Sequence, residues 1–319
     1  MAVHIGIAKT GTTSIQRYLV RNRELLLDRF GLLIPRTSSV GVGHHAIAVD
    51  LNEPPRSPEL RIPDLARRLR AEFEASGAER ALLSSEWLGF SHHPERLPEV
   101  LGTDDIDIVV RLRRQDQWLE SMFREQLKRT GSVTDIDEYA AKPRIQRVAD
   151  FDSLLGRWSA VAPVERTRVG LFPPGEPGRS IEVDLLADVG VVAEDLPVPD
   201  RPTKLALNRH SLAYLEEQRA RGATITPSSG DFVLRALARF SRREPDPPQW
   251  RHHLDPQRRR RYLDGFLEGN ANVARHYLGR DALFSDAPSD GPWEPYPGLD
   301  DETRAQIEVD IEKLTERRS

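Results

Sequence analysis

The chain has 319 residues, of which 38% are hydrophobic and 30% charged, a composition typical of a globular protein that can bury a core. Its formal net charge of −4 gives no overall attraction to nucleic acid or to an anionic membrane. Cysteine is absent, which excludes disulfides and cysteine-based nucleophiles or metal sites, and no apolar stretch approaches the ~20 residues that a membrane span requires.

The first half of the chain alternates predicted strands with predicted helices. An apolar run at residues 3–8 predicts a buried strand, and apolar residues at helical spacing predict a helix over 14–29. Further strands are predicted at 31–35, 80–85, 106–112 and 168–172, and helices at 65–76 and 115–128. This alternation predicts an α/β fold of three layers, with a central parallel sheet between two layers of helices.

The last third is mostly helical, with helices predicted at 181–189, 209–219, 232–241 and 257–277. No Gly/Ser-rich linker precedes these helices, so we expect one α/β domain over residues 1–285 with a helical C-terminal cap. Residues 286–319 are expected to form a polar tail with a terminal helix over 301–316. We expect this helix to dock on the domain. The alternative is a partner-binding helix, through which the chain would form a homo-oligomer.

The sequence also bears on partners and compartment. Four consecutive arginines, Arg258 to Arg261, follow Asp255 and Pro256, which are typical of a helix start. A solvated helix face explains this run better than a nucleic-acid site, so no nucleic-acid partner is expected. The chain enters its first strand almost at once, and together with the lack of cysteine this favours a cytoplasmic protein.

A glycine-bearing turn links the first strand to the first helix. Such a turn gathers backbone N–H groups at the positive end of the helix dipole, which predicts an anion site for phosphate or sulfate. Gly6 and Gly11 have the spacing of the Walker A motif, but Thr12 stands where that motif has its lysine. The lysine instead precedes the second glycine, as Lys9, which disfavours an ordinary ATPase or kinase. A loop that merely caps the helix is the alternative.

The sequence Lys-Thr-Gly-Thr-Thr-Ser at residues 9–14 resembles the 5′-phosphosulfate-binding loop of sulfotransferases that use PAPS, 3′-phosphoadenosine-5′-phosphosulfate. The resemblance implies a P-loop-like fold, PAPS as sulfate donor, the bisphosphate PAP as product, and no required metal. It implies that Lys9 neutralises the oxygen that bridges phosphate and sulfate. The residues that it assigns to donor binding in this loop are Lys9, Thr10, Gly11, Thr12, Thr13 and Ser14.

A second candidate anion site follows the strand predicted at 106–112. Arg113 leaves this strand and Ser121 lies eight residues later in the next helix. A guanidinium and a hydroxyl can converge on one phosphate. The spacing resembles the 3′-phosphate-binding segment of sulfotransferases, which implies that Arg113 and Ser121 hold the phosphate that distinguishes PAPS from ADP-like nucleotides. A surface serine and an ordinary strand-end arginine are the alternative.

A hydroxyl or amine acceptor must lose a proton when it receives a sulfuryl group, so a general base is expected. The resemblance implies a histidine or a glutamate in this role. His44 and His45, in a glycine-flanked loop, and Glu86, at the end of a strand, are the candidates. Histidine has a suitable pKa of ~6.5 without any shift, whereas a glutamate base needs its pKa raised by burial. The sequence leaves the choice open.

These segments together predict a sulfotransferase that transfers the sulfuryl group from PAPS to a small-molecule, carbohydrate or lipid acceptor by in-line displacement. The alternatives are a P-loop nucleotide kinase or NTPase and a non-catalytic nucleotide-binding protein. A kinase needs a carboxylate after a strand to hold Mg²⁺, and Asp104 and Asp105 precede their strand instead. No metal-ligand cluster is visible, because adjacent histidines do not naturally share one metal on regular structure.

Overall fold

The computed structural model describes residues 1–52, 58–173, 180–192, 196–197, 206–223, 225, 231–286 and 291–316. Its contacts divide the chain into two compact units. The first unit contains Met1–Arg114, Gln146–Arg201 and Phe266–Ser285, and the second contains Gln115–Ile145, Pro202–Gly265 and Asp286–Ser319. In the second unit a helix from the middle of the chain, residues 115–129, packs with later helices, and the expected single domain over 1–285 stays a prediction.

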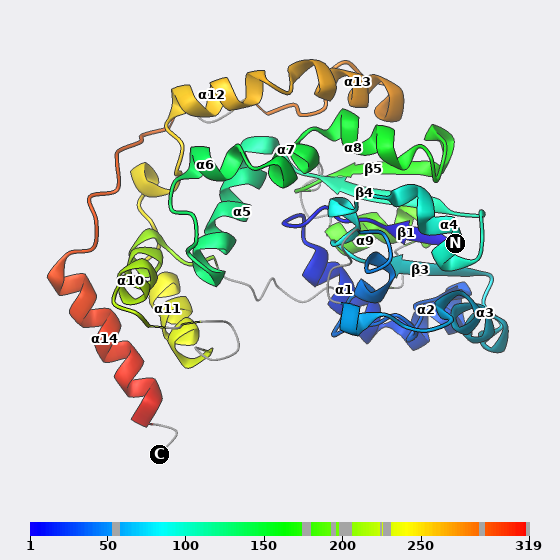
Figure 1. Cartoon of the computed structure of the whole chain (residues 1–319), viewed down its shortest axis with the longest axis horizontal. Coiled ribbons are helices and arrows are strands. Elements are labelled where there is room, and N and C mark those ends of the chain that lie inside the picture. Colours follow the sequence, from blue (N-terminus) through cyan, green and yellow to red (C-terminus); the bar gives the residue numbers. More distant parts are fainter. Residues whose placement is uncertain are drawn as a thin grey trace. The chain divides into compact units, whose positions relative to one another are not determined.

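A five-stranded parallel sheet forms the centre of the first unit, among the described residues (Figure 1). Its order is β2-β3-β1-β4-β5. The strands are β1 (Ala2–His4), β2 (Leu32–Leu33), β3 (Arg80–Ser84), β4 (Asp107–Leu112) and β5 (Thr167–Leu171). Beyond β1 the chain still bonds to β4, since the amide of Ile7 donates to the carbonyl of Arg111 over 3.2 Å. The expected α/β fold with a parallel sheet is confirmed.

Helices cover the sheet because its strands are apolar on both faces. One apolar cluster joins the strands to α1 (Thr12–Arg21) and α9 (Ile181–Asp188). Val3 points to the opposite face from its neighbours in β1 and is also fully buried. The unit's other helices are α2 (Arg23–Phe30), α3 (Leu65–Ser76), α4 (Leu97–Leu101), α8 (Phe151–Trp158) and α13 (Leu267–Leu278), while α7 (Pro143–Ala149) crosses the unit boundary.

Two of the predicted helices are each interrupted once. The helix expected over 14–29 ends at Arg21 and restarts at Arg23, because the Asn22 side chain donates to the carbonyl of Tyr18 over 2.9 Å. The helix expected over 257–277 divides at Gly265 into α12 (Pro256–Asp264) and α13. The boundary between the two units follows Gly265, so α12 and α13 belong to different units.

β4 carries a buried arginine in the middle of the sheet. Arg111 is 1% exposed, and its Nη1 lies 2.6 Å from Oδ2 of Asp188 on α9. Gly170 on β5 is its partner in the strand register, and a Cβ atom at position 170 would lie 2.5 Å from that Nη1. A glycine is therefore needed at position 170 to make room for the guanidinium.

We expect Gly170→Ala to lower the free energy of unfolding by about 3 kcal/mol, since the added methyl group displaces a buried, paired arginine. Gly156→Ala is the matched control: Gly156 lies in α8 with no atom within 4 Å of an added Cβ, and alanine favours a helix. Urea denaturation of both variants measures the difference. Equal free energies for the two variants would contradict the account of Arg111.

The second unit is a helical assembly. Its helices are α5 (Gln115–Arg129), α6 (Ile136–Ala140), α10 (Arg209–Ala220), α11 (Asp231–Arg243), α12 and α14 (Asp301–Glu316). The arginine run in α12 is not the uniformly solvated face that was expected. Arg259 is 2% exposed, with its Nε 3.6 Å from Oδ2 of Asp116, because α12 packs on α5 and that helix presents buried carboxylates to it. Arg258 pairs with Asp137 of α6.

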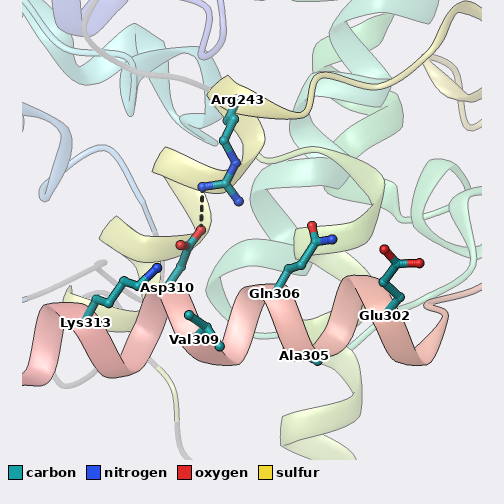
Figure 2. Close-up of a pocket in the computed structure, with 7 residues that line it drawn as sticks. All are labelled: Arg243, Glu302, Ala305, Gln306, Val309, Asp310 and Lys313. Atoms are coloured by element: carbon teal, nitrogen blue, oxygen red, sulfur yellow. Dashed lines mark ion pairs between the residues drawn. The ribbon is translucent and has the colours of Figure 1, made fainter.

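The terminal helix α14 has the predicted bounds, and it docks on α11 and α10. Ile307 is fully buried, Arg304 pairs with Glu217 of α10 at 3.0 Å, and Arg243 of α11 lies 2.9 Å from Asp310. Figure 2 shows this last ion pair beside a groove lined by Arg243, Glu302, Ala305, Gln306, Val309, Asp310 and Lys313. The expected docking is confirmed, and a homo-oligomer formed through this helix stays a prediction.

The segment before α14, expected to be part of a polar tail, contacts the second unit through two aromatic side chains. Trp293 donates its indole N–H to the carbonyl of His252 over 3.2 Å, and the Tyr296 hydroxyl lies 2.9 Å from Nδ1 of His210. Aromatic side chains therefore fix this part of the tail to the second unit. Among the described residues, no helix combines the length and apolarity that crossing a bilayer requires.

Candidate functional site

The candidate site lies at the carboxyl edge of the sheet in the first unit. The chain leaves β1 towards β2 on one side of the sheet and leaves β4 towards β5 on the other. Neighbouring strands with diverging connections open a crevice where α/β proteins bind ligands. The loop with Lys9 follows β1 and Arg113 follows β4, and Nη1 of Arg113 donates to the carbonyl of Lys9 over 3.2 Å. The structure therefore brings these two predicted cations to the same crevice.

The loop between β1 and α1 has an unusual backbone. Gly6 and Gly11 have φ angles of 98° and 80°, and Lys9 has a φ of 67°. A lysine in this left-handed region costs about 1–3 kcal/mol, which the surrounding contacts must compensate. The Thr10 hydroxyl helps by donating to the carbonyl of Ile7 over 2.6 Å. Strain of this kind is concentrated at ligand-binding sites, which fits the predicted anion site.

Phe172, which sequence reasoning missed, packs its ring against the guanidinium of Arg113. This contact adds to the hydrogen bond between Arg113 and the Lys9 carbonyl. The guanidinium carbon lies 5.3 Å from the centre of the Phe172 ring, at the end of β5. The same ring would lie 3.3 Å from a Cβ atom at Gly11, so the loop backbone and Phe172 are in close contact. Its only signal in the sequence is its place after an apolar strand, at the edge where the loop also lies.

Glu182 is a second residue that sequence reasoning missed. It is 5% exposed in the first turn of α9 and accepts a hydrogen bond from the Ser14 hydroxyl. The Ser14 amide already donates to the carbonyl of Gly11 over 2.9 Å. Glu182 also places a negative charge beside the start of α1. The positive charge that an anion requires must therefore come from Lys9 and Arg113.

Ser121, the expected partner of Arg113, lies on α5 in the second unit. Its hydroxyl is partly exposed there. A shared contact of Arg113 and Ser121 with one phosphate stays a prediction.

Ser84, the last residue of β3, and the two residues after it each form a hydrogen bond with a different side chain. The Ser84 amide donates to Nδ1 of His44 over 3.0 Å, the Ser85 hydroxyl lies 2.9 Å from Nδ1 of His45, and Glu86 accepts a bond from Gln16. Ser85 and Glu86 leave the sheet at the same edge as the loop. This short segment therefore contains one candidate base, Glu86, and positions the other two, His44 and His45.

His44 is placed where it cannot act as a base. It is 1% exposed, its Nδ1 accepts from the Ser84 amide, and its Nε2 lies 2.9 Å from the carbonyl of Pro35, to which it donates. Burial lowers the pKa of His44 to about 4, so the ring is neutral at pH 7. Both ring nitrogens are occupied, and His44 is removed from the candidates as a structural residue.

His45 and Glu86 lie together in a half-buried cluster. Nε2 of His45 is 4.0 Å from Oε2 of Glu86, and the imidazole stacks on Trp87 with ring centres 4.6 Å apart. Burial lowers the pKa of His45, and the Glu86 carboxylate partly opposes this by favouring the charged ring. The neutral imidazole and the carboxylate are both able to accept a proton. A Cβ atom at Gly6 would lie 3.0 Å from Cα of Glu86, so the backbone of Glu86 packs closely against the start of the loop.

The structure offers no dedicated metal centre in the parts that it describes, since no group of three or more His, Asp or Glu side chains there could hold an ion. Asp105 lies at the start of β4, at the opposite edge of the sheet from the loop, and pairs with Arg166 at 2.7 Å. It is therefore far from the place where a kinase would need its magnesium ligand.

Comparison with known proteins gives distant likenesses in structure alone. No family model matches this chain, and no curated protein matches it. A solved sulfotransferase structure from Alicyclobacillus acidocaldarius is similar at 20% sequence identity with a TM-score of 0.45, covering 69% of this chain and 90% of that chain. This likeness does not assign the chain to a family, and the function proposed below rests on the residues of the site.

Proposed function

We propose that this protein is a sulfotransferase that uses PAPS as donor and a hydroxyl or amine of a small molecule, carbohydrate or lipid as acceptor. The observation that carries the proposal is the hydrogen bond that Gln16, one turn into the helix that begins at the lysine-bearing anion loop, donates to the carboxylate of Glu86, a group able to act as a base. A donor loop and a proton acceptor in one crevice suit group transfer to a hydroxyl. Simple nucleotide binding needs only the loop.

The donor supplies the sulfuryl group and a phosphate leaving group. Lys9 places its ammonium beside the developing negative charge, and the amides at the start of α1 hold the phosphate. The guanidinium of Arg113, fixed by the Lys9 carbonyl and by Phe172, adds the second positive charge. These groups position and stabilise charge, as proteins do in the analogous phosphoryl transfer.

Glu86 is the base in this proposal. Its carboxylate accepts the proton of the acceptor while the oxygen–sulfur bond forms. Glu86 is favoured over His45 because its carboxylate is held by Gln16 of α1, the helix that begins at the anion loop, whereas the His45 ring is held by Ser85 and Trp87. His45, 4.0 Å away, then stabilises the charge on Glu86 or takes up its proton.

The alternative to be tested is a P-loop kinase. Glu86 also follows a strand next to β1, where a kinase could use it to hold Mg²⁺. The position of Lys9 before Gly11 favours the sulfotransferase. Incubation with ³⁵S-labelled PAPS and a cell extract, followed by identification of the labelled product, tests the proposal and names the acceptor. Phosphate transfer from Mg²⁺-ATP without any sulfate transfer would favour the kinase.

We expect PAP to bind about 10- to 100-fold more tightly than ADP, because charge-assisted hydrogen bonds to the 3′-phosphate are made by PAP alone. Arg113→Ala should remove most of this preference in a calorimetric titration. Arg168→Ala is the control, since Arg168 is an exposed arginine on β5 that donates to the carbonyl of Glu165. Equal affinities for PAP and ADP in the unmodified protein would contradict the roles of Arg113 and Ser121.

A further inference from the structure

Gln16 is a buried polar residue of α1 whose amide points at the end of β3. It is 2% exposed, and its Nε2 donates to Oε2 of Glu86 over 2.6 Å. The same nitrogen lies 3.5 Å from the carbonyl of Ser84. A buried amide needs hydrogen-bond partners to offset its desolvation. The amide of Gln16 has them in the segment from Ser84 to Glu86.

The contact joins the two halves of the site through one helix. Gln16 lies one turn after Thr12, so the two side chains share a face of α1. The first turn of α1 completes the anion loop, while Gln16 reaches Glu86. Glu86 is also fixed by Gly6 at the start of the loop, where an added Cβ atom would lie 3.0 Å from its Cα. Both ends of the β1–α1 connection therefore contact this glutamate.

The surroundings of Gln16 leave little freedom to the amide. A Cβ atom at Gly43 would lie 3.0 Å from Nε2 of Gln16 and 2.7 Å from the ring of His45. The titratable group facing Glu86 is His45, at 4.0 Å, and its neighbours from α1 and from the loop, Gln16 and Gly6, are uncharged. Gln16 is thus a neutral donor held against one carboxylate oxygen.

We propose that Gln16 is the positioning residue for the general base. By holding Oε2 of Glu86, it sets the orientation of the carboxylate relative to the anion loop and leaves Oε1 for the acceptor. One helix then fixes both the donor phosphate, at its first turn, and the base, one turn later. This inference rests on the proposed function, in which Glu86 accepts the proton.

The test uses the full chain with Gln16→Met, which keeps the length of the side chain but has no donor. The carboxyl carbon of Glu86, followed by NMR at pH 7 in ¹³C-glutamate-labelled protein and assigned with Glu86→Gln, should change its chemical shift in Gln16→Met, because the carboxylate loses the hydrogen bond to Oε2. We also expect the turnover of ³⁵S-labelled PAPS to fall about tenfold, with the Kd for PAP unchanged within twofold.

Tyr18→Phe is the matched control. Tyr18 is also buried on α1 and donates one hydrogen bond, 2.8 Å long, to the carbonyl of Pro197. Its loss should lower stability without moving the Glu86 carboxyl resonance or the turnover. If Gln16→Met does not fold, Gln16→Asn takes its place, because it keeps a buried amide but withdraws the N–H by one methylene group.

The outcomes separate the two proposals. PAP binding with an unmoved Glu86 carboxyl resonance in Gln16→Met would overturn the role of Gln16 alone, as would a turnover loss that Tyr18→Phe reproduces. Failure of the unmodified protein to bind PAP would overturn the proposed function, and the role of Gln16 with it. A moved Glu86 resonance with unchanged PAP affinity and reduced turnover supports both.

Discussion

Lys9→Ala is expected to lower the rate of sulfate transfer by about 10²- to 10³-fold, the typical cost of removing one group that stabilises charge in a transition state. The loss falls on the rate because the lysine neutralises charge that grows only as the sulfur–oxygen bond breaks. Turnover of ³⁵S-labelled PAPS measures it. Lys313→Ala, at an exposed lysine of α14, is the control and should leave turnover unchanged.

The left-handed backbone of Lys9 allows a second, independent measurement. Because φ is 67° at this position, glycine is tolerated there and alanine is strained. Lys9→Gly should therefore lose the same rate as Lys9→Ala yet have a free energy of unfolding about 1 kcal/mol higher than Lys9→Ala. Turnover that survives Lys9→Ala within a few-fold would contradict the proposed mechanism, whatever the two stabilities are.

Glu86→Gln should lower turnover by about 10²- to 10³-fold, in the range that a general base contributes. The substituted amide keeps the size of the side chain but accepts no proton at neutral pH. His45→Gln should cost less, about tenfold, because His45 acts beside Glu86 in the proposal. Rates for both variants, with PAP affinity measured in parallel, separate catalysis from donor binding.

His44→Gln provides the comparison within the histidine pair. It removes two buried hydrogen bonds, to Ser84 and Pro35, so it should reduce stability and leave the turnover of the folded fraction unchanged. If His45→Gln instead loses more rate than Glu86→Gln, His45 is the base and Glu86 is its partner.

The parts of this molecule that local pattern determines were predictable from the sequence. The apolar run before the loop, the helical spacing after it and the alternation that followed predicted the parallel sheet. Helical spacing alone predicted α14 with its observed bounds. Lys9 and Arg113 were each predicted as anion-binding residues that follow a strand, and parallel strands end at one edge of the sheet, where Arg113 donates to the carbonyl of Lys9.

The remaining features depend on tertiary contacts that spacing does not encode. His44 and His45 are adjacent and look alike in sequence, and only the fold places one in the core and the other beside Glu86. Gln16 had no signal, because a glutamine in an amphipathic helix is usually exposed. Arg259 was hidden in a run of four arginines, and its burial depends on the carboxylates of a helix more than 130 residues away.

The hydrogen bonds of His44 also limit where insertions are tolerated in the loop that precedes His44 and His45. The two ring nitrogens of His44 bond to Ser84 of β3 and to the carbonyl of Pro35. These bonds fix the position of the backbone from which His45 continues. An insertion beside Gly41, which is exposed and has open space around it, then lengthens this loop without displacing His45. One residue inserted between the two histidines would remove His45 from Ser85 and Trp87. Related chains can therefore differ in that loop and keep the same acceptor chemistry, provided that the two histidines remain adjacent.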